Sequence, residues 1–284
     1  MDPSAFDAFA PTYDADFTHT WLGQLLRQRV WRVLAQQFTA GRHLLELACG
    51  TGEDAVWLAQ QGILVTATDG SAEMVRATAV KAEQAGVSER VTAVPLSLQD
   101  LVAGRNPYSV TRHPIMDYRL RITDYGLPIT DYDGVVSNFG GLNTIGEWRP
   151  LAESLAGLVK SGGKLVLVVM GPWCPWEVGW HLLHGEWGTA VRRFRSSAPA
   201  AIGKNTIPIW YPSARRLRQE FAPWFDHVHT ESLGLWLPPS YLGHLVERWP
   251  RLFTRLNRWE RRTARLTGGW GDHYVLVLER IEGV

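Results

Sequence analysis

The chain has 284 residues, of which 45% are hydrophobic and 20% are charged, and this balance excludes a disordered chain, a collagen-like fibre and a coiled-coil rod. Its 29 lysines and arginines nearly balance 28 aspartates and glutamates, so no chain-wide positive field exists to hold a polyanion.

Apolar residues at three-to-four-residue spacing predict a helix over residues 18–38, before Gly41 ends the run. Short apolar or β-branched runs then alternate with helical patterns as far as residue 170. The predicted strands are 43–49, 63–69, 90–96, 132–137 and 164–170. The predicted helices between them are 53–61, 71–85 and 147–160. Such alternation predicts a mostly parallel sheet with helices on both faces.

Three segments interrupt this rhythm. Residues 104–131 are too long for an ordinary connection and are expected to be an insertion, with a β-hairpin as one option. A second insertion is rich in tryptophan and arginine and fills 171–211, and a third, basic and helical in pattern, fills 239–266. The remaining elements are a helix over 213–221 and strands over 226–235 and 272–279, which bring the predicted sheet to seven strands with the last one antiparallel.

The cysteine count, the N-terminal residues and the length of the apolar runs predict the cellular compartment. Two cysteines, Cys49 and Cys174, are too few for a disulfide-stapled secreted protein. The N-terminal residues are acidic, and no apolar run approaches about 18 residues. We therefore expect a cytoplasmic protein.

The segment LLELACGTGED, residues 44–54, is the most informative. A predicted strand there runs directly into Gly50-Thr51-Gly52 and then into a helix, so that a ligand can approach the backbone and the unpaired N–H groups at the helix start. Asp69 ends the next strand, where a carboxylate can accept both hydroxyls of a ribose. No third glycine follows in the spacing of a dinucleotide site, and Glu46 would repel a pyrophosphate. The pattern favours a nucleoside with a positive group, such as S-adenosylmethionine.

Four segments, ELACGTGED, TDGSAEM, PLSLQDL and DGVVSNFGGLN, resemble the successive motifs of class I S-adenosylmethionine-dependent methyltransferases, in the branch of ubiquinone/menaquinone-type and other small-molecule enzymes. The resemblance covers roughly residues 5–170. It implies an α/β, doubly wound, Rossmann-like fold whose seven-stranded sheet has helical insertions over the acceptor side. We expect a single methyltransferase domain over 1–284, with an N-terminal helical arm over 1–40 and a cofactor-binding core over 41–170.

The resemblance also implies which residues bind the cofactor. The glycine turn would pass the methionine moiety, Asp69 would hold the ribose, the loop after the third strand would contact the adenine, and the end of the fourth strand would face the methyl group. The residues assigned in this way are Tyr13 in the arm; Glu46, Ala48, Gly50 and Gly52 at the turn; Asp69, Gly70 and Met74; Ser97, Leu98 and Gln99; and Asn138, Phe139 and Gly140. Ala48 replaces a usual glycine and Ser97 a common aspartate. The alternative interpretations are an incidental acid beside a glycine turn and, for Tyr13, a packed aromatic residue.

Residues 173–188, WCPWEVGWHLLHGEWG, predict a helix just after the fifth strand. We interpret it as a lid, in which His181 or His184 acts as general base over an apolar acceptor pocket. The predicted aromatic face consists of Trp176, Trp180, Leu183 and Trp187. The alternative is that this face is core packing and the histidines are surface residues. Glu177 with the two histidines also resembles a metal triplet, but we expect a metal-independent enzyme.

Residues 241–266 combine leucines and tryptophans at helical spacing with seven arginines, and Pro250 is expected to divide the helix. Such a helix can lie on an anionic bilayer, at the inner face of the membrane, and give access to a lipid-soluble acceptor. The alternative is a helical pair packed on the sheet with solvated arginines.

These patterns together predict methyl transfer to a small, apolar or aromatic acceptor, at oxygen first, with nitrogen and carbon as alternatives. An RNA or other nucleic-acid methyltransferase is the competing enzyme, although Ser-Asn-Phe-Gly follows the fourth strand where base-amino methyltransferases have Asn/Asp-Pro-Pro-aromatic. A non-catalytic cofactor- or lipid-binding protein of the same fold is the alternative from another class. Acceptor identity and oligomeric state are not predicted.

Overall fold

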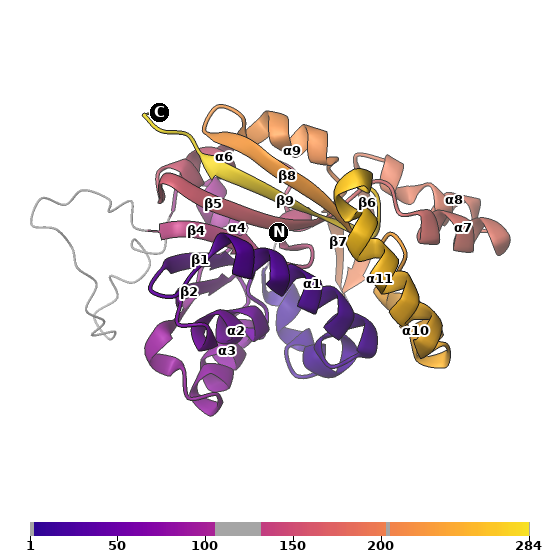
Figure 1. The fold of residues 1–284 in the computed structure, drawn as a ribbon, viewed down its shortest axis with the longest axis horizontal. Coiled ribbons are helices and arrows are strands. Elements are labelled where there is room, and N and C mark those ends of the chain that lie inside the picture. The colour runs from indigo at the N-terminus through magenta and orange to yellow at the C-terminus, as the bar shows by residue number, and fades with distance from the viewer. Residues whose placement is uncertain (1–2, 106–131, 203–204, 284) are drawn as a thin grey trace, which may run out of the picture.

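A twisted seven-stranded sheet lies at the centre of the computed structural model, which describes residues 3–105, 132–202 and 205–283 (Figure 1). The strand order is β3-β2-β1-β4-β5-β9-β8. The strands are β1 (His43–Leu47), β2 (Leu64–Asp69), β3 (Val91–Pro95), β4 (Tyr132–Ser137), β5 (Val159–Met170), β8 (Phe225–Leu233) and β9 (His273–Arg280). The first five are parallel, and β9 is antiparallel to both of its neighbours, β5 and β8. The predicted fold class is confirmed.

Helices cover both faces of the sheet because alternate strand residues point to opposite sides. In β4, Val136 packs into the core under the first helix layer and Val135 packs into the core under the second. The first layer consists of α1 (Trp21–Gln37), α2 (Glu53–Gln60), α3 (Ala72–Gln84), α10 (Gly243–Arg248) and α11 (Pro250–Thr267). The second consists of α4 (Leu98–Val102), α6 (Arg149–Ala156) and α9 (Ala214–Phe221).

Side-chain caps fix where several of these helices begin. Thr20 accepts a hydrogen bond from the Gly23 N–H at the start of α1, and Ser71 does the same for Met74 at the start of α3. Ser97 and Asp100 form a reciprocal capping box at the start of α4. The caps at Ser71 and Ser97 fix where the loops that follow β2 and β3 end, at the edge of the sheet formed by the carboxyl ends of these strands.

The segment after β5 differs from its prediction. A helix over 173–188 was expected, but α7 (Pro175–Leu183) ends early because Gly185 adopts a positive φ of 75°. Trp187 therefore belongs to a separate turn, α8 (Trp187–Ala190), and does not continue the face of Trp176. A hairpin that the sequence did not predict follows, formed by β6 (Ser197–Ile202) and β7 (Asn205–Trp210).

Other boundaries shift by a few residues. The helix predicted over 147–160 ends at Ala156, because Val159 already pairs with Tyr132 as the first residue of β5. The third insertion is helical as predicted, and Pro250 divides it into α10 and α11. Most of the insertion at 104–131 lies outside the described residues. Short 3-10 turns occupy Pro3–Phe9, Ser88–Arg90, Gly141–Thr144, Arg192–Phe194 and Ser240–Leu242, and a π-helical turn occupies Asp14–Thr18.

Candidate active site

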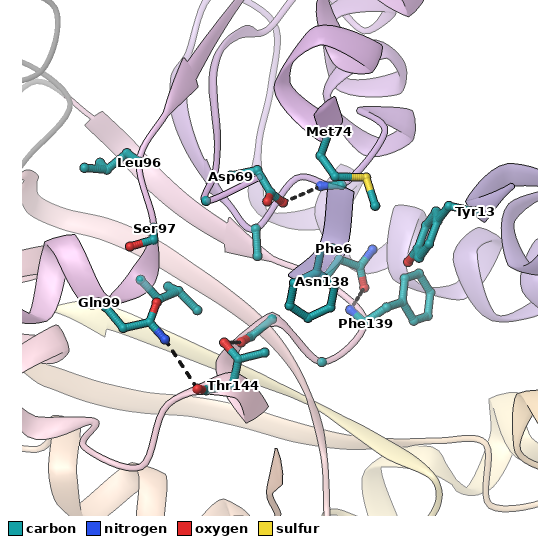
Figure 2. Close-up of a pocket in the computed structure, with 16 residues that line it drawn as sticks. Phe6, Tyr13, Asp69, Met74, Leu96, Ser97, Gln99, Asn138, Phe139 and Thr144 are labelled. Carbon is teal, nitrogen blue, oxygen red and sulfur yellow. Dashed lines mark hydrogen bonds between the residues drawn. The ribbon is translucent and has the colours of Figure 1, made fainter. Parts of the chain in front are cut away.

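A cavity of about 160 Å³ opens at the carboxyl ends of the parallel strands (Figure 2). Its lining contains every predicted cofactor residue except Glu46 and Gly52. The predicted residues are Tyr13, Ala48, Gly50, Asp69, Gly70, Met74, Ser97, Leu98, Gln99, Asn138, Phe139 and Gly140, and those that the sequence did not indicate are Phe6, Leu96, Gly141 and Thr144. Four strand ends and the N-terminal arm thus meet at one site.

The turn after β1 is held in a left-handed conformation. Gly50 has φ 57° and Gly52 has φ 79°, values that favour glycine. A Cβ on Gly52 would lie 2.6 Å from the Thr78 side chain, so Gly52 contributes the close packing of the turn on α3 rather than a wall of the cavity.

Two non-glycine residues in the described ranges have a positive φ, and both line the cavity. They are Ala48, at 52°, and Phe139, at 42°. Such backbone strain, of order 1–3 kcal/mol per residue, gathers at functional sites, where the surrounding structure enforces it. Both strained positions thus lie in the wall of the candidate site.

The carboxylate of Asp69 is oriented by backbone donors. Its Oδ2 accepts from the Gly50 N–H at 3.0 Å and its Oδ1 from the Ser71 N–H at 2.9 Å, so it ties the glycine turn to the start of α3. Burial raises the pKa of this carboxyl in spite of these bonds. Each oxygen retains acceptor capacity toward the cavity that it lines.

Glu46 lies on β1 beneath the turn, outside the cavity lining, and is 1% exposed. Burial, and secondly the charge of Asp54, raise the pKa of its carboxyl well above the usual range. Among the described residues, its Oε2 has no hydrogen-bond partner. An orphaned buried carboxylate next to the glycine turn fits a positively charged ligand group, which would supply both the missing partner and the missing charge.

A buried network fixes the end of β4. Asp54 accepts from the Asn138 amide at 2.8 Å and from the Trp31 indole at 2.7 Å, and it forms an ion pair with Arg27. The Arg27 guanidinium also lies 4.9 Å from the ring centre of Phe139. Asn138 and Phe139 are therefore positioned by residues of α1 and α2. Sequence spacing does not reveal this network, because the hydrogen bond between Asn138 and Asp54 alone joins residues 84 positions apart.

The N-terminal arm is tied across the cavity by polar contacts. Asp14 accepts from the Thr51 hydroxyl at 2.6 Å and pairs with Lys81 at 2.7 Å. The Ser71 hydroxyl donates to Asp7 at 2.5 Å. These contacts hold the arm where Phe6 and Tyr13 line the cavity, on the same side of it as Phe139 (Figure 2).

The two predicted catalytic histidines lie outside the cavity lining. His181 places Nδ1 2.5 Å from Glu186 and Nε2 3.2 Å from the Tyr241 hydroxyl. His184 donates from Nδ1 to the Trp180 carbonyl in its own helix. The expected aromatic face is also incomplete, because Leu183 is 86% exposed and Trp187 is 70% exposed.

Glu177 does not lie with these histidines. It is buried and receives bidentate hydrogen bonds from Arg192 and a further bond from Arg193, which hold the pKa of its carboxyl below the usual value. The described ranges contain no group of three or more His, Cys, Asp or Glu side chains that could hold a metal ion.

One histidine that the sequence did not single out does contact the cavity wall. His273, the first residue of β9, packs edge-on against Phe139 with ring centres 5.8 Å apart. Its Nδ1 lies 3.1 Å from Asp272 Oδ2, and Arg193 pairs with the other oxygen of Asp272 at 2.6 Å. The only sequence signal was Asp-His at the start of the last strand, and the antiparallel return of β9 beside β5 is what brings it to the site.

The close contact between Gly141 and Ala48 gives a stability prediction. A Cβ on Gly141 would lie 2.6 Å from Ala48 Cβ, so Gly141→Ala should lower the free energy of unfolding by about 1–3 kcal/mol. Ala48→Gly removes the obstructing methyl group at a positive φ and should restore most of the loss in the double variant. Denaturant unfolding of the four proteins measures this coupling, and strictly additive losses would contradict the contact.

Comparisons with known proteins come from sequence and from structure. Residues 44–117 match the family model described as a methyltransferase domain, which spans the glycine turn, β2 and β3. No curated protein matches the chain. The described part of the chain contains no helix that is long and apolar enough to span a membrane.

Many solved structures share the fold at low sequence identity. The [4+2]-cyclase SpnF aligns with a TM-score of 0.60 at 16% identity, over 98% of this chain and 94% of its own. An S-adenosylmethionine-dependent methyltransferase from Mesorhizobium loti aligns with a TM-score of 0.54 at 15% identity, over 88% of this chain and 97% of its own. Geranyl diphosphate C-methyltransferase from Streptomyces coelicolor A3(2) aligns with a TM-score of 0.54 at 12% identity, over 90% of this chain and 79% of its own. That structure is a complex with Mg²⁺, geranyl diphosphate and S-adenosyl-L-homocysteine.

Proposed function

The chain contains a class I S-adenosylmethionine-dependent methyltransferase domain, and from this premise we propose that it methylates a small, apolar or aromatic acceptor at oxygen. The apolar and aromatic wall of the cavity supports this acceptor class most directly. Phe6, Tyr13 and Phe139 form one side of the cavity, and Phe17 packs edge-on against Phe139 at 5.0 Å between ring centres. The relation to the ubiquinone/menaquinone-type branch is part of the same proposal.

The cofactor would supply an electrophilic methyl group on a sulfonium. Asp69 would accept the ribose hydroxyls, since its carboxylate is already oriented by Gly50 and Ser71. Glu46 would compensate the ammonium of the methionine moiety, because its buried Oε2 otherwise has no partner among the described residues. Both groups are acceptors, which suits a ligand of hydroxyls and positive charge.

The adenine end would be held more by packing than by hydrogen bonds from Ser97. The Ser97 hydroxyl already donates to Asp100 at 2.8 Å and accepts from the Asp100 N–H at 3.1 Å. Leu98 is buried beside it, and Gln99 reaches across the opening to the Thr144 carbonyl at 3.5 Å. The replacement of a usual aspartate by serine therefore leaves the adenine amino group with a weak acceptor.

Transfer to an oxygen acceptor requires removal of its proton, and we propose a histidine for this step. His181 and His184 are the candidates that the sequence predicts, and His273 is the one whose ring contacts Phe139. The carboxylate of Asp272 lies beside Nδ1 of His273, with Oδ2 at 3.1 Å. The contact with the cavity wall favours His273.

Alanine variants of the three histidines test this choice. His273→Ala should lower kcat by roughly 10²–10⁴ and remove the acidic limb of the pH profile, while cofactor affinity stays within about threefold. His181→Ala and His184→Ala should keep near-native turnover. A large loss at His181 or His184 instead would support the lid hypothesis, and native profiles for all three variants would exclude a histidine base.

Methyl transfer itself is tested with radiolabelled cofactor and a panel of phenols, alcohols, amines and a transfer RNA. A mass gain of one methyl group on a hydroxyl compound supports the proposal. Label that enters only RNA would favour the nucleic-acid alternative, and cofactor binding without transfer to any acceptor would favour a non-catalytic protein.

We further propose that α10 and α11 contact the inner face of an anionic membrane, from which a lipid-soluble acceptor would enter. Leu252, Trp259 and Leu266 recur every seven residues on one stripe of α11 and are 50%, 59% and 87% exposed. Arginines flank this stripe along the helix. Exposed tryptophans beside arginines are typical of interfacial helices.

Co-sedimentation with vesicles tests the membrane contact. We expect binding to phosphatidylglycerol vesicles at low salt, weak binding to phosphatidylcholine, and a severalfold loss for Trp259→Ser with Leu266→Ser. Trp270→Ser, at another exposed indole, is the matched control. Absence of binding by the parent protein at low salt would exclude this contact.

A further inference from the structure

A second cavity, of about 430 Å³, lies between α1 and the C-terminal half of α11, away from the candidate active site. Figure 1 shows both helices on the same side of the sheet. The cavity is lined by Arg29, Arg32, Val33, Gln36, Glu231, Arg261, Arg262, Ala264 and Arg265. Five arginines thus face a single glutamate.

Two of these arginines already have acidic partners. Arg29 is buried and pairs with Glu260 at 2.7 Å, and Arg265 donates from Nε to Glu231 at 2.9 Å. Glu231 also lies 3.3 Å from His229, so its capacity is largely used. Within the ranges that the structure describes, Arg32, Arg261 and Arg262 have no ion pair.

The guanidiniums of Arg32, Arg261 and Arg262 line one cavity and repel one another. Burial, followed by repulsion from Arg261 and Arg29, lowers the pKa of Arg32. All three arginines are exposed, so solvent screens part of their mutual repulsion, and an anion bound between them would be attracted by all three charges. Each guanidinium presents several N–H donors in a plane, a geometry that matches the oxygens of a phosphate.

We propose that the cavity between α1 and α11 binds a phosphate group through Arg32, Arg261 and Arg262. Its volume exceeds that of one phosphate, so it suits a diphosphate or a phosphate ester whose organic part reaches out of the opening. Such a group could belong to a free metabolite or to a lipid head group. The proposal does not depend on methyl transfer, and its test contains no cofactor.

Calorimetry with inorganic pyrophosphate at low ionic strength tests the site. Arg32→Gln with Arg262→Gln removes two unpaired charges from the cavity and should raise the dissociation constant roughly tenfold or more. Arg251→Gln with Arg255→Gln removes the same amount of charge from positions of α11 that are also exposed but do not line the cavity, and should change the dissociation constant by less than about threefold. Equal losses in both double variants, or absence of binding by the parent, would overturn the proposal.

Vesicles distinguish the two sources of phosphate. If a lipid head group occupies the cavity, pyrophosphate should compete with phosphatidylglycerol vesicles for the parent, and the Arg32/Arg262 variant should bind the vesicles less tightly than the Arg251/Arg255 variant. If a free metabolite occupies the cavity, the two variants should bind vesicles equally, and only the Arg32/Arg262 variant should lose affinity for pyrophosphate.

Discussion

Asp69→Asn should raise the dissociation constant for S-adenosylmethionine by roughly two orders of magnitude or more, since hydrogen bonds to a charged acceptor contribute about 1.5–3 kcal/mol each. The asparagine keeps the shape of the side chain and one oxygen for the Gly50 or Ser71 N–H, so the turn should stay folded. Its amide cannot accept both hydroxyls of a ribose. Calorimetry measures the affinity, and thermal unfolding checks the fold.

The control for Asp69 is another acid at the start of α3. Glu73→Gln removes an exposed carboxylate that accepts hydrogen bonds from Arg76, and it should leave the affinity for the cofactor within about twofold of the parent value. Asp69→Ala should be worse than Asp69→Asn, because it leaves two backbone N–H groups without an acceptor. Cofactor binding at parental affinity in Asp69→Ala would remove the basis of the assigned site.

The same carboxyls make cofactor affinity depend on pH. Burial raises the pKa of both Asp69 and Glu46 in the free protein, so each carboxyl keeps its proton to a higher pH than an exposed carboxyl does. A cationic ligand with donor hydroxyls favours the ionised forms, and binding should therefore release protons. Affinity should rise with pH until both groups are ionised in the free protein, and the slope should be smaller in Asp69→Asn.

The sequence predicted the parts of the site that depend on local backbone chemistry. Gly50 and Asp69 are identified by their position at strand ends, and parallel strands place their carboxyl ends at one edge of the sheet. The same logic predicts that Asn138 and Phe139 lie at this edge, because they follow β4. It does not predict how they are oriented, which depends on Arg27 and Asp54 in α1 and α2.

The segment after β5 and the contacts of β9 could not be predicted in this way. Apolar spacing predicts that the helix after β5 continues past Gly185, because spacing alone cannot show where a glycine adopts a positive φ. His273 reaches the cavity wall only because β9 returns antiparallel to β5, and Arg193 joins Asp272 across 79 residues of sequence. Contacts between segments so far apart are set by tertiary packing, which the spacing within one segment does not encode.

Replacement of Arg27 is the stability change with the largest expected effect. Arg27 and Asp54 form an ion pair whose side chains are only 6% and 5% exposed. Arg27→Met would leave a buried carboxylate with only the Trp31 and Asn138 N–H donors, and should lower the free energy of unfolding by about 3–5 kcal/mol. Denaturant titration measures the loss.

A double variant of Arg27 and Asp54 separates their effect on folding stability from their effect on the position of Asn138 and Phe139. Arg27→Met with Asp54→Leu replaces the pair by apolar groups and should recover most of the stability, since buried ion pairs are often no better than well-packed hydrophobic residues. Asn138 would still lack its acceptor and Phe139 its guanidinium, so cofactor affinity should stay at least roughly tenfold below that of the parent. Native affinity in the stable double variant would show that the network does not position the β4 end.

Arg29→Met provides the matched comparison two residues further along α1. Arg29 pairs with Glu260, and both side chains are almost completely buried, at 7% and 0% exposure. Its removal should cost a similar free energy of unfolding, yet it should leave the affinity of the folded protein for the cofactor unchanged, because neither partner lines the active-site cavity. If both arginine variants lose affinity in proportion to stability, the effect of Arg27 is a general loss of folding rather than a displacement of Asn138 and Phe139.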